Sequence, residues 1–426
     1  MEWPTKIYVE VTTRCNLRCP MCVKTISNNA IPDADMESAV FRRLLPALSK
    51  VDTLILNGIG ESLLHPELAK FISLAREKMA PGSTIGLQTN GFLLSDKLAQ
   101  ELISRGLSTI CLSVDCFDDT SLWQNPEAHS FEAIEKAAQH IEKARTLHRS
   151  DFSLGLEIVL TKRTIRQLPD LIEWGAKNGV DYIITSHLIL YDQAAESESL
   201  FNPHTPQTIE CIERYMKKAE AKGVDFFSEV AKHHRFAGTQ TDPAFLDLFN
   251  QLRKELRSSD HSVNYETFQD IHQDDMSELH ALFERARHIA EQYSIDLQLA
   301  PLYGNSVRHC PFIDEKTLFI SATGEVMPCH FLWHSYVCRV SFEEIQVKKQ
   351  SFGSITEQSI ADIWESKSYR NFRQEAGAND YAPCLTCQQG PCPTLISNEQ
   401  NYGNDCYGSQ VPCGHCHWNL GGVKCL

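Results

Sequence analysis

Three closely spaced cysteines near the start of the chain constrain what it can fold into more than any other feature. Cys15, Cys19 and Cys22 stand in the sequence CNLRCPMC, directly after an apolar run at residues 7–11 that predicts a short strand. A structural metal site is normally closed by four protein ligands, whereas three thiolates that hold a cubane cluster leave one iron open. The spacing therefore predicts an open iron–sulfur site at which a substrate or a cofactor binds.

Most of the remaining cysteines are concentrated at the other end of the chain. Of the 16 cysteines in 426 residues, ten lie between Cys310 and Cys425. The first residues lack the basic and apolar segments of a secretory signal, so disulfide bonds are not the expected use of these thiols. We therefore expect metal or redox chemistry in a cytoplasmic protein.

Composition and charge narrow the class of partner. Hydrophobic residues make up 42% of the chain and charged residues 22%, which is typical of a globular protein with two or three domains. The formal net charge of −15 repels phosphate, which argues against non-specific binding to nucleic acid or to an anionic membrane. No apolar run approaches the roughly 18 residues of a membrane span, so no transmembrane helix is expected.

The first 190 residues alternate between strand-like and helix-like patterns. Six strands with short connections predict an α/β fold, in which a parallel sheet is covered by helices. Strands are predicted at residues 7–11, 53–56, 84–88, 109–114, 152–160 and 182–190, with helices between them at residues 36–48, 66–75, 95–105, 131–147 and 167–178.

Polar residues follow several of these strands at the point where each strand ends. Asn57-Gly58 follows the second predicted strand, Asn90-Gly91 follows the third, and Asp115 follows the fourth. In parallel α/β architectures ligands bind beyond the carboxyl ends of the strands. We therefore expect these residues and the opening cysteines to face the same mouth.

Residues 191–295 lose this alternation and predict a helical insertion. Amphipathic patterns occur at residues 209–221, 243–257 and 276–293, in a region rich in charges and helix formers. We expect a helical elaboration or lid without chemistry of its own. Residues 296–426 are expected to form a cysteine-rich α+β or irregular domain, with one helix around residues 360–375.

At the cysteine motif the chain resembles the radical S-adenosylmethionine (SAM) enzymes, in which Cys-x3-Cys-x2-Cys follows the first strand. The resemblance implies a partial (β/α)6, TIM-like barrel over residues 1–190. It also implies a 4Fe–4S cluster on Cys15, Cys19 and Cys22, with the amino and carboxylate groups of SAM on the open iron. One-electron reduction, by a donor such as flavodoxin or ferredoxin, would cleave SAM to a 5′-deoxyadenosyl radical that abstracts hydrogen from the substrate. The alternative is half of a zinc site that is completed elsewhere.

A second motif of this family follows the second predicted strand. Gly58-Ile59-Gly60-Glu61 resembles the family's Gly-Gly-Glu motif, with Ile59 in place of its first glycine. The resemblance implies that backbone groups here receive the SAM ammonium, because glycine permits a close approach. Met21 stands where many relatives carry an aromatic residue near the adenine, and its thioether is able to contact an aromatic ring.

Further matches follow the third and fourth strands. Asn90 lies in a tripeptide that many relatives share, while Ser113 and Asp115 stand where relatives bind the ribose hydroxyls. The alternatives are an ordinary turn at Asn90 and a helix cap at Asp115. Cys116 is a candidate hydrogen-atom donor to a substrate radical, and the alternative is a small buried apolar residue.

The tail resembles the SPASM extension, which carries auxiliary clusters in peptide-modifying members of this family. Cys310, Gly324 and Cys329 reproduce its opening pattern, and residues 355–373 resemble the segment before its second cysteine group. The resemblance implies one or two auxiliary 4Fe–4S clusters. Two clusters need eight thiolates and the tail supplies ten, so Cys338, which lies outside the pattern, is chosen as one spare. The expected ligands, whose pairing stays open, are Cys310, Cys329, Cys384, Cys387, Cys392, Cys406, Cys413, Cys416 and Cys425.

A structural zinc is the alternative for part of this tail. Cys384-x2-Cys387 followed by Cys413-x2-Cys416 is also acceptable spacing for a zinc ribbon.

The family resemblance implies radical chemistry on a peptide or protein substrate. The closing segment at residues 413–425 is similar to SPASM proteins that mature metalloenzymes, which gives a narrower hypothesis. One alternative is dehydrogenation or epimerisation of a small metabolite. An alternative from another class is an iron–sulfur carrier or scaffold, which the SAM-loop motifs disfavour because a scaffold does not need them.

Overall fold

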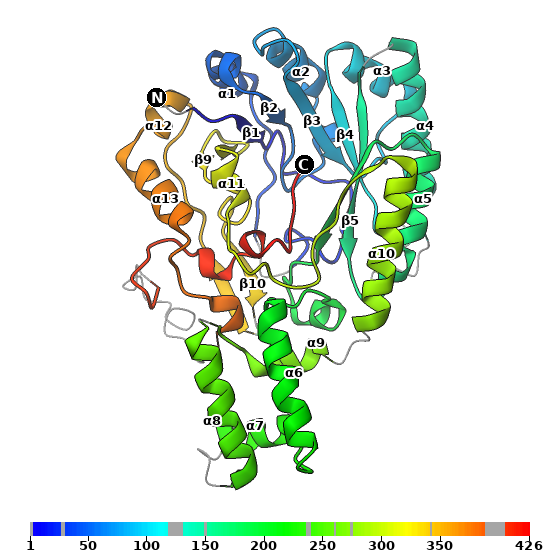
Figure 1. Ribbon diagram of the computed structural model, residues 1–426. Coiled ribbons are helices and arrows are strands. Elements are labelled where there is room, and N and C mark those ends of the chain that lie inside the picture. The colour runs from blue at the N-terminus through cyan, green and yellow to red at the C-terminus, as the bar shows by residue number, and fades with distance from the viewer. Residues whose placement is uncertain are drawn as a thin grey trace.

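A nine-stranded sheet runs through the protein, with β1 paired on both edges (Figure 1). In the computed structural model the strand order is β7-β6-β5-β4-β3-β2-β1-β8-β9, with parallel pairing from β7 to β8 and β9 antiparallel to β8. The strands are β1 (Lys6–Val9), β2 (Thr53–Ile55), β3 (Thr84–Thr89), β4 (Thr109–Ser113), β5 (Ser153–Leu160), β6 (Tyr182–His187), β7 (Asp296–Gln298), β8 (Thr317–Ile320) and β9 (Val326–Met327). The structure describes residues 3–26, 30–117, 131–148, 151–235, 240–259, 261–272, 276–340, 343–387 and 405–426.

Helices between the parallel strands cover the outer side of the sheet, and they confirm the expected α/β architecture (Figure 1). The strands they cover are almost continuously apolar, as strands buried on both faces should be, and Ile7 and Leu54 are fully buried. Ser95 accepts a hydrogen bond from the Leu98 amide, which starts α3 where the sequence predicts it. The covering helices are α1 (Ser38–Leu44), α2 (Leu68–Arg76), α3 (Asp96–Ser104), α4 (Phe131–His148), α5 (Leu168–Lys177) and α10 (Met276–Tyr293).

A second group of helices has a core of its own and projects from the body of the protein (Figure 1). These helices are α6 (Pro206–Glu220), α7 (Phe226–Arg235), α8 (Pro243–Ser258) and α9 (Tyr265–His272). The sequence predicts α6 and α8, but α7 and α9 were not expected, because each is short and depends on packing against its neighbours. By contrast, α10 packs against α5 and so belongs to the layer that covers the sheet.

The tail contributes to the central sheet as well as forming its own elements. Strand β8 pairs with β1 in register, with Thr317 opposite Lys6, and β7 pairs with β6. Beyond them β10 (Tyr336–Val340) and β11 (Glu343–Val347) form an antiparallel hairpin. The single helix expected around residues 360–375 is wrong, because α12 (Ile360–Trp364) ends and Ser366 caps a second helix, α13 (Lys367–Ala378). No helix within the described parts of the chain is long and apolar enough to cross a membrane.

Phe245→Ala should unfold the projecting helices locally while the sheet stays folded. Phe245 is fully buried and stacks on Phe249 with ring centroids 5.2 Å apart. Removing a buried phenylalanine costs about 3–5 kcal/mol, and the separate core confines that loss to the projecting group. Hydrogen exchange should therefore rise in α6 and α8 but not in β1 to β6. Leu147→Ala, at a side chain that is 62% exposed, is the control and should change neither; equal exchange in the two regions of the Phe245 variant would contradict the two-core description.

Candidate active site

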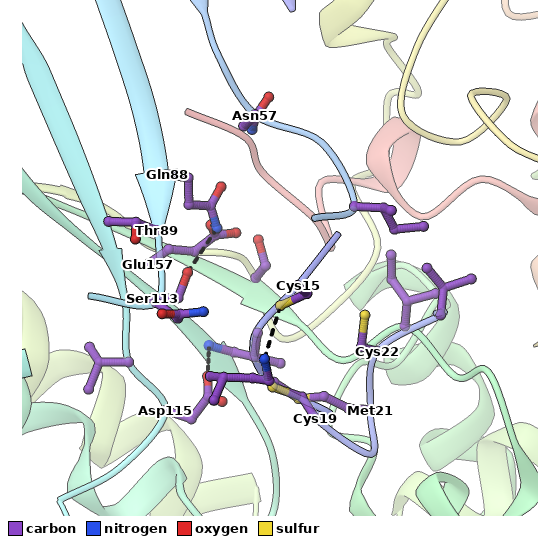
Figure 2. Close-up of a pocket in the computed structure, with 18 of the residues that line it drawn as sticks. Cys15, Cys19, Met21, Cys22, Asn57, Gln88, Thr89, Ser113, Asp115 and Glu157 are labelled. Atoms are coloured by element: carbon purple, nitrogen blue, oxygen red, sulfur yellow. Dashed lines mark hydrogen bonds between the residues drawn. The ribbon is translucent and has the colours of Figure 1, made fainter. Parts of the chain in front are cut away.

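A cavity of about 380 Å³ lies at the carboxyl ends of the parallel strands. The three opening cysteines lie on the loop after β1 and line one side of it, as Figure 2 shows. Every other residue that the sequence predicts for cofactor binding or catalysis lines the same cavity. These residues are Met21, Gly58, Gly60, Glu61, Asn90, Ser113, Asp115 and Cys116.

Two glycines let the loop after β2 pack directly against the loop that carries the cysteines. A Cβ atom on Gly60 would lie 2.5 Å from the main-chain oxygens of Thr12 and Arg14, so a larger residue does not fit there. The Glu61 amide donates a hydrogen bond of 2.8 Å to the Arg14 carbonyl. A Cβ atom on Gly58 would lie 2.4 Å from the Cγ atom of Glu10. The two loops are therefore fixed relative to each other by contacts that only glycine permits.

The Glu61 carboxylate joins this loop to the loop after β3. It accepts hydrogen bonds from the Leu63 amide (3.0 Å), the Thr89 hydroxyl (2.8 Å) and the Asn90 amide (2.9 Å), and only 3% of Glu61 is exposed. Burial raises the pKa of this carboxyl, and the three hydrogen bonds partly offset that rise. The Asn90 side chain in turn donates to Asn16, the neighbour of Cys15, over 3.0 Å. Glu61 therefore fixes the loops after β2 and β3 relative to each other at the edge of the cavity.

Burial raises the pKa of all three thiols of the opening motif, which favours their protonated form. Burial raises the pKa of Cys19 to about 12, and the nearby Cys22 and Asp115 add to this effect. Burial also raises the pKa of Cys15 and of Cys22. Metal ligation requires thiolates, so occupation of this site must release protons.

Several residues that line the cavity were not predicted from the sequence, and Gln88 and Glu157 are two of them. The Gln88 amide donates a hydrogen bond of 3.1 Å to the Ser113 hydroxyl and another to the Glu157 carboxylate (Figure 2). Glu157 lies in β5 and faces the cavity opposite the cysteines. Burial, together with the charge of Asp115, raises its pKa to about 7. The sequence does contain a signal for Glu157, because it is the one charged residue in the mostly apolar strand SLGLEIVL. Burying a charged side chain in a strand is costly unless other groups pair with it or hydrogen-bond to it.

Residues of the tail form the remaining wall of the cavity. The Ser186 hydroxyl at the end of β6 donates to the Lys424 carbonyl (3.1 Å) and accepts from the Lys424 amide (3.0 Å). The thiol of Cys425 lies 3.1 Å from the indole nitrogen of Trp418, which donates to it, and 3.3 Å from Nδ1 of His330. All four tail residues line the cavity. Cys425, expected as an auxiliary ligand, is therefore placed at the active site.

Four other tail thiols surround a second, smaller cavity of about 20 Å³. Cys310, Cys329, Cys413 and Cys416 all line it, although they come from separate segments of the tail. The zinc-ribbon alternative requires Cys413 and Cys416 to share one ion with Cys384 and Cys387, and neither of those two lines this cavity. Within the ranges that the structure describes, no three Cys, His, Asp or Glu side chains surround a point suited to a single metal ion.

The other cysteines of the tail lie elsewhere. Cys384 begins a short 3₁₀ helix that packs against the one formed by Cys413–His415, and a Cβ atom on Gly414 would lie 2.7 Å from the Cys384 sulfur. Cys406 is exposed, and Cys392 lies outside the described residues. Cys338 is buried in β10 among apolar side chains.

Glu157→Gln should remove part of the pH dependence of stability. The carboxyl has a folded pKa of about 7, above the ordinary value of 4.5, so between these two values the folded state holds a proton that the unfolded state releases. The resulting stability is fully present below pH 4.5 and is lost as pH rises through about 7. Thermal melts across this range should fall less steeply for the variant than for the natural protein, whereas Glu77→Gln, at an exposed helix end, should melt in parallel with the natural protein. Identical slopes for Glu157→Gln and the natural protein would contradict the shifted pKa.

Family models match the two ends of the chain separately. Residues 9–175 match the radical SAM superfamily, and residues 310–388 match SPASM, an iron–sulfur cluster-binding domain. The first match contains the opening cysteines and β1 to β5, and the second contains Cys310 and Cys329 of the smaller cavity.

Individual proteins resemble the chain over different lengths. A tungsten-containing aldehyde ferredoxin oxidoreductase cofactor-modifying protein from Pyrococcus furiosus is 26% identical over 98% of this chain and 96% of its own length. A PqqA peptide cyclase from Gluconobacter oxydans is 23% identical over 52% of this chain and 59% of its own length. The structure of Streptococcus suis SuiB bound to S-adenosylmethionine has a TM-score of 0.53 at 13% identity, covering 90% of this chain and 71% of SuiB, and it supports the fold alone.

The cysteine loop and the glycine loop packed on it both lie within residues 9–175, which match the radical SAM superfamily. The cofactors that these domains imply are a 4Fe–4S cluster and SAM for the first domain and auxiliary iron–sulfur clusters for the second. The chain is a radical SAM enzyme with a C-terminal SPASM domain.

Proposed function

We propose that this enzyme is a radical SAM maturase that modifies a peptide or protein, and that its target is a metalloenzyme or the cofactor of one. The full-length similarity to a protein that modifies the cofactor of a tungsten enzyme supports the target class. Similarity to a peptide cyclase over about half of the chain supports a peptide or protein substrate. The electron donor we propose is flavodoxin or ferredoxin.

The observation that carries this proposal is the composite cavity. Its cysteine side comes from the radical SAM domain, while His330, Trp333, Trp418 and Lys424 come from the tail. With a volume of about 380 Å³ it is at the small end of the range for ligand pockets, which is about 300–1,000 Å³. A folded protein does not enter such a space, so a substrate must present a single side chain or a compact ring system to it.

The residues of the cavity fit the cofactors of the family. Cys15, Cys19 and Cys22 supply three thiols on one short loop, the donor set of a cluster with one open iron. Gly58 and Gly60 let a cradle of main-chain atoms pack closely against the cysteine loop, and among the described residues the Asn57 side-chain oxygen has no hydrogen-bond partner there. We therefore assign the cluster to the cysteines, and the binding of SAM to the cradle together with Met21, Asn90, Ser113 and Asp115. When bound, SAM supplies a carbon-centred radical after one-electron reduction.

The chain's own polar residues hold this arrangement in place. Asp115 accepts a hydrogen bond of 3.3 Å from the Val159 amide, which ties the end of β4 to β5. Gln88 bridges Ser113 and Glu157, so three neighbouring strands present polar groups to one space. We propose that Glu157, whose pKa lies near neutrality, takes up or gives back a proton during substrate modification. Cys116, 6% exposed and facing the same cavity, stays a candidate hydrogen-atom donor.

The smaller cavity indicates which tail thiols belong to the same auxiliary cluster. We assign one auxiliary cluster to Cys310, Cys329, Cys413 and Cys416, because these four line one space. Cys384, Cys387, Cys392 and Cys406 are the thiols we assign to a second cluster. We also propose the division into a radical SAM core at residues 1–190, a helical insertion at 191–295 and a SPASM domain at 296–426. The separate core of α6 to α9 supports the insertion, whereas α10 at its end packs against α5 of the radical SAM core.

Modification of a small metabolite is the second candidate function. The limited volume of the cavity favours it, since a space of about 380 Å³ that must also hold SAM suits a small molecule. The two candidates differ in the size of the molecule that must stimulate the enzyme.

The anaerobically reconstituted enzyme should form 5′-deoxyadenosine from SAM when dithionite is added. Formation should rise when a protein fraction of a cell extract is present, because a substrate makes SAM cleavage productive, and mass spectrometry would measure both products. Cys19→Ala should abolish the reaction. Stimulation by a low-mass fraction instead would favour the metabolite alternative, and a lack of 5′-deoxyadenosine under all conditions would contradict radical chemistry.

Iron analysis should separate the two groups of tail thiols. Cys416→Ala removes a thiol of the smaller cavity and should lower the iron content by about four atoms per chain, the complement of one 4Fe–4S cluster. Cys425→Ala, whose thiol lies at the active site, is the matched control and should keep the full iron content. The same loss of iron from both variants would contradict the assignment of Cys425.

A further inference from the structure

A buried glutamate lies directly beneath the glycine loop that we assign to SAM. Glu10 follows β1 and precedes Cys15 by five residues, and its side chain is 0% exposed. Its Oε1 atom accepts a hydrogen bond of 3.1 Å from the Ile59 amide, at the centre of the glycine loop. The same carboxylate accepts bonds from Nε2 of His334, at 3.0 Å to Oε1 and 3.1 Å to Oε2.

His334 belongs to the tail and not to the radical SAM domain. It lies between β9 and β10, five residues after Cys329, which lines the smaller cavity. Between them, His330 and Trp333 line the active-site cavity. The six residues from Cys329 to His334 therefore connect the auxiliary thiols to the loop beside the opening cysteines.

The position of the Glu10 side chain leaves it little freedom. A Cβ atom on Gly58 would lie 2.4 Å from its Cγ atom and 2.7 Å from its Oε1 atom, so the backbone of the glycine loop rests on this carboxylate. A fully buried carboxylate is costly unless it is paired and hydrogen-bonded. His334 supplies the pairing group. Among the described residues it is the side chain that hydrogen-bonds to the Glu10 carboxylate.

We propose that Glu10 and His334 are a positioning pair that couples the SPASM domain to the SAM-binding loop. His334 holds the carboxylate, and the carboxylate orients the Ile59 amide and with it the cradle at Gly58 and Gly60. The inference rests on the proposed assignment of SAM to this loop. It makes SAM affinity depend on a tail residue that lines neither cavity.

Reciprocity gives the coupling a second consequence. If the tail residue strengthens SAM binding, SAM binding must strengthen the attachment of the tail by the same factor. The rise in melting temperature that saturating SAM causes should therefore be smaller in a variant without the pair.

The test is the dissociation constant of SAM, measured by anaerobic titration calorimetry on the reconstituted full-length enzyme. His334→Ala should weaken SAM binding by about tenfold or more, because a hydrogen bond to a charged group is lost from beneath the loop. His334→Gln, which retains a side-chain N–H donor, should recover most of that loss. His309→Ala is the matched control: it removes a histidine of the same domain that is 52% exposed and pairs with Asp314, and it should leave SAM affinity unchanged.

Two readouts distinguish positioning from general damage. The iron content and the electron paramagnetic resonance signal of the reduced cluster before SAM addition should be the same in His334→Ala and the natural enzyme. In steady-state assays of 5′-deoxyadenosine formation, KM for SAM should rise more than kcat falls. If His334→Ala folds poorly, His334→Phe fills the same volume without a donor, and the same weakening is expected.

The outcomes separate this inference from the proposed function. Failure of the natural enzyme to bind SAM would overturn the function and the pair together. Normal SAM binding by the natural enzyme and by His334→Ala alike would overturn the pair alone. Weakened binding in His334→Ala that His334→Gln does not restore would also overturn it, because the N–H donor would then not be what matters.

Discussion

The close approach of two loops is the contact on which the rest of the active site depends. Gly60 packs against the main chain of Thr12 and Arg14 at a distance that no side chain allows, and the Glu61 amide bonds to the same segment. This contact exists because β1 and β2 are parallel neighbours whose carboxyl ends open on the same side. Cysteines that follow one strand and glycines that follow the next therefore meet, and the cavity forms at their junction.

The radical SAM domain alone does not complete that cavity. The tail adds β8 to the edge of β1, and residues 422–424 run beside the end of β6, where the His187 amide donates to the Gly422 carbonyl. In Figure 1 the C-terminal end accordingly lies against the sheet and not on the outer surface. The wall that carries the three cysteines and the opposite wall thus come from distant parts of the chain. The short segment from Cys329 to His334 links the auxiliary thiols, the tail wall of the cavity and the glycine loop, which explains how a SPASM extension would influence the cofactor side of an active site whose other wall it builds.

Local pattern was enough to predict β1 to β6 of the sheet and the cysteine loop, because both depend on short-range signals. Apolar runs bounded by polar turns gave β1 to β6, and the strand-end motifs at Gly58, Asn90 and Asp115 meet as expected because parallel strands share one open edge. The pairing of segments that lie far apart in the sequence could not be predicted from local pattern. Nothing near Thr317 indicates that β8 joins β1, and nothing near Cys425 indicates that its thiol lies at the active site and not with Cys416. Glu157 and Glu10 were overlooked because each lies within or beside an apolar strand, where their partners come from distant segments.

The central claim is that the open site made by Cys15, Cys19 and Cys22 receives the amino group of SAM. The most direct test is electron–nuclear double resonance on the reduced, reconstituted enzyme, with SAM carrying an isotope-labelled amino nitrogen. The account predicts a hyperfine coupling between that nitrogen and the cluster, and loss of this coupling together with the cluster signal in Cys19→Ala. A reduced cluster that binds three thiolates but shows no coupling to the labelled nitrogen at saturating SAM would contradict it.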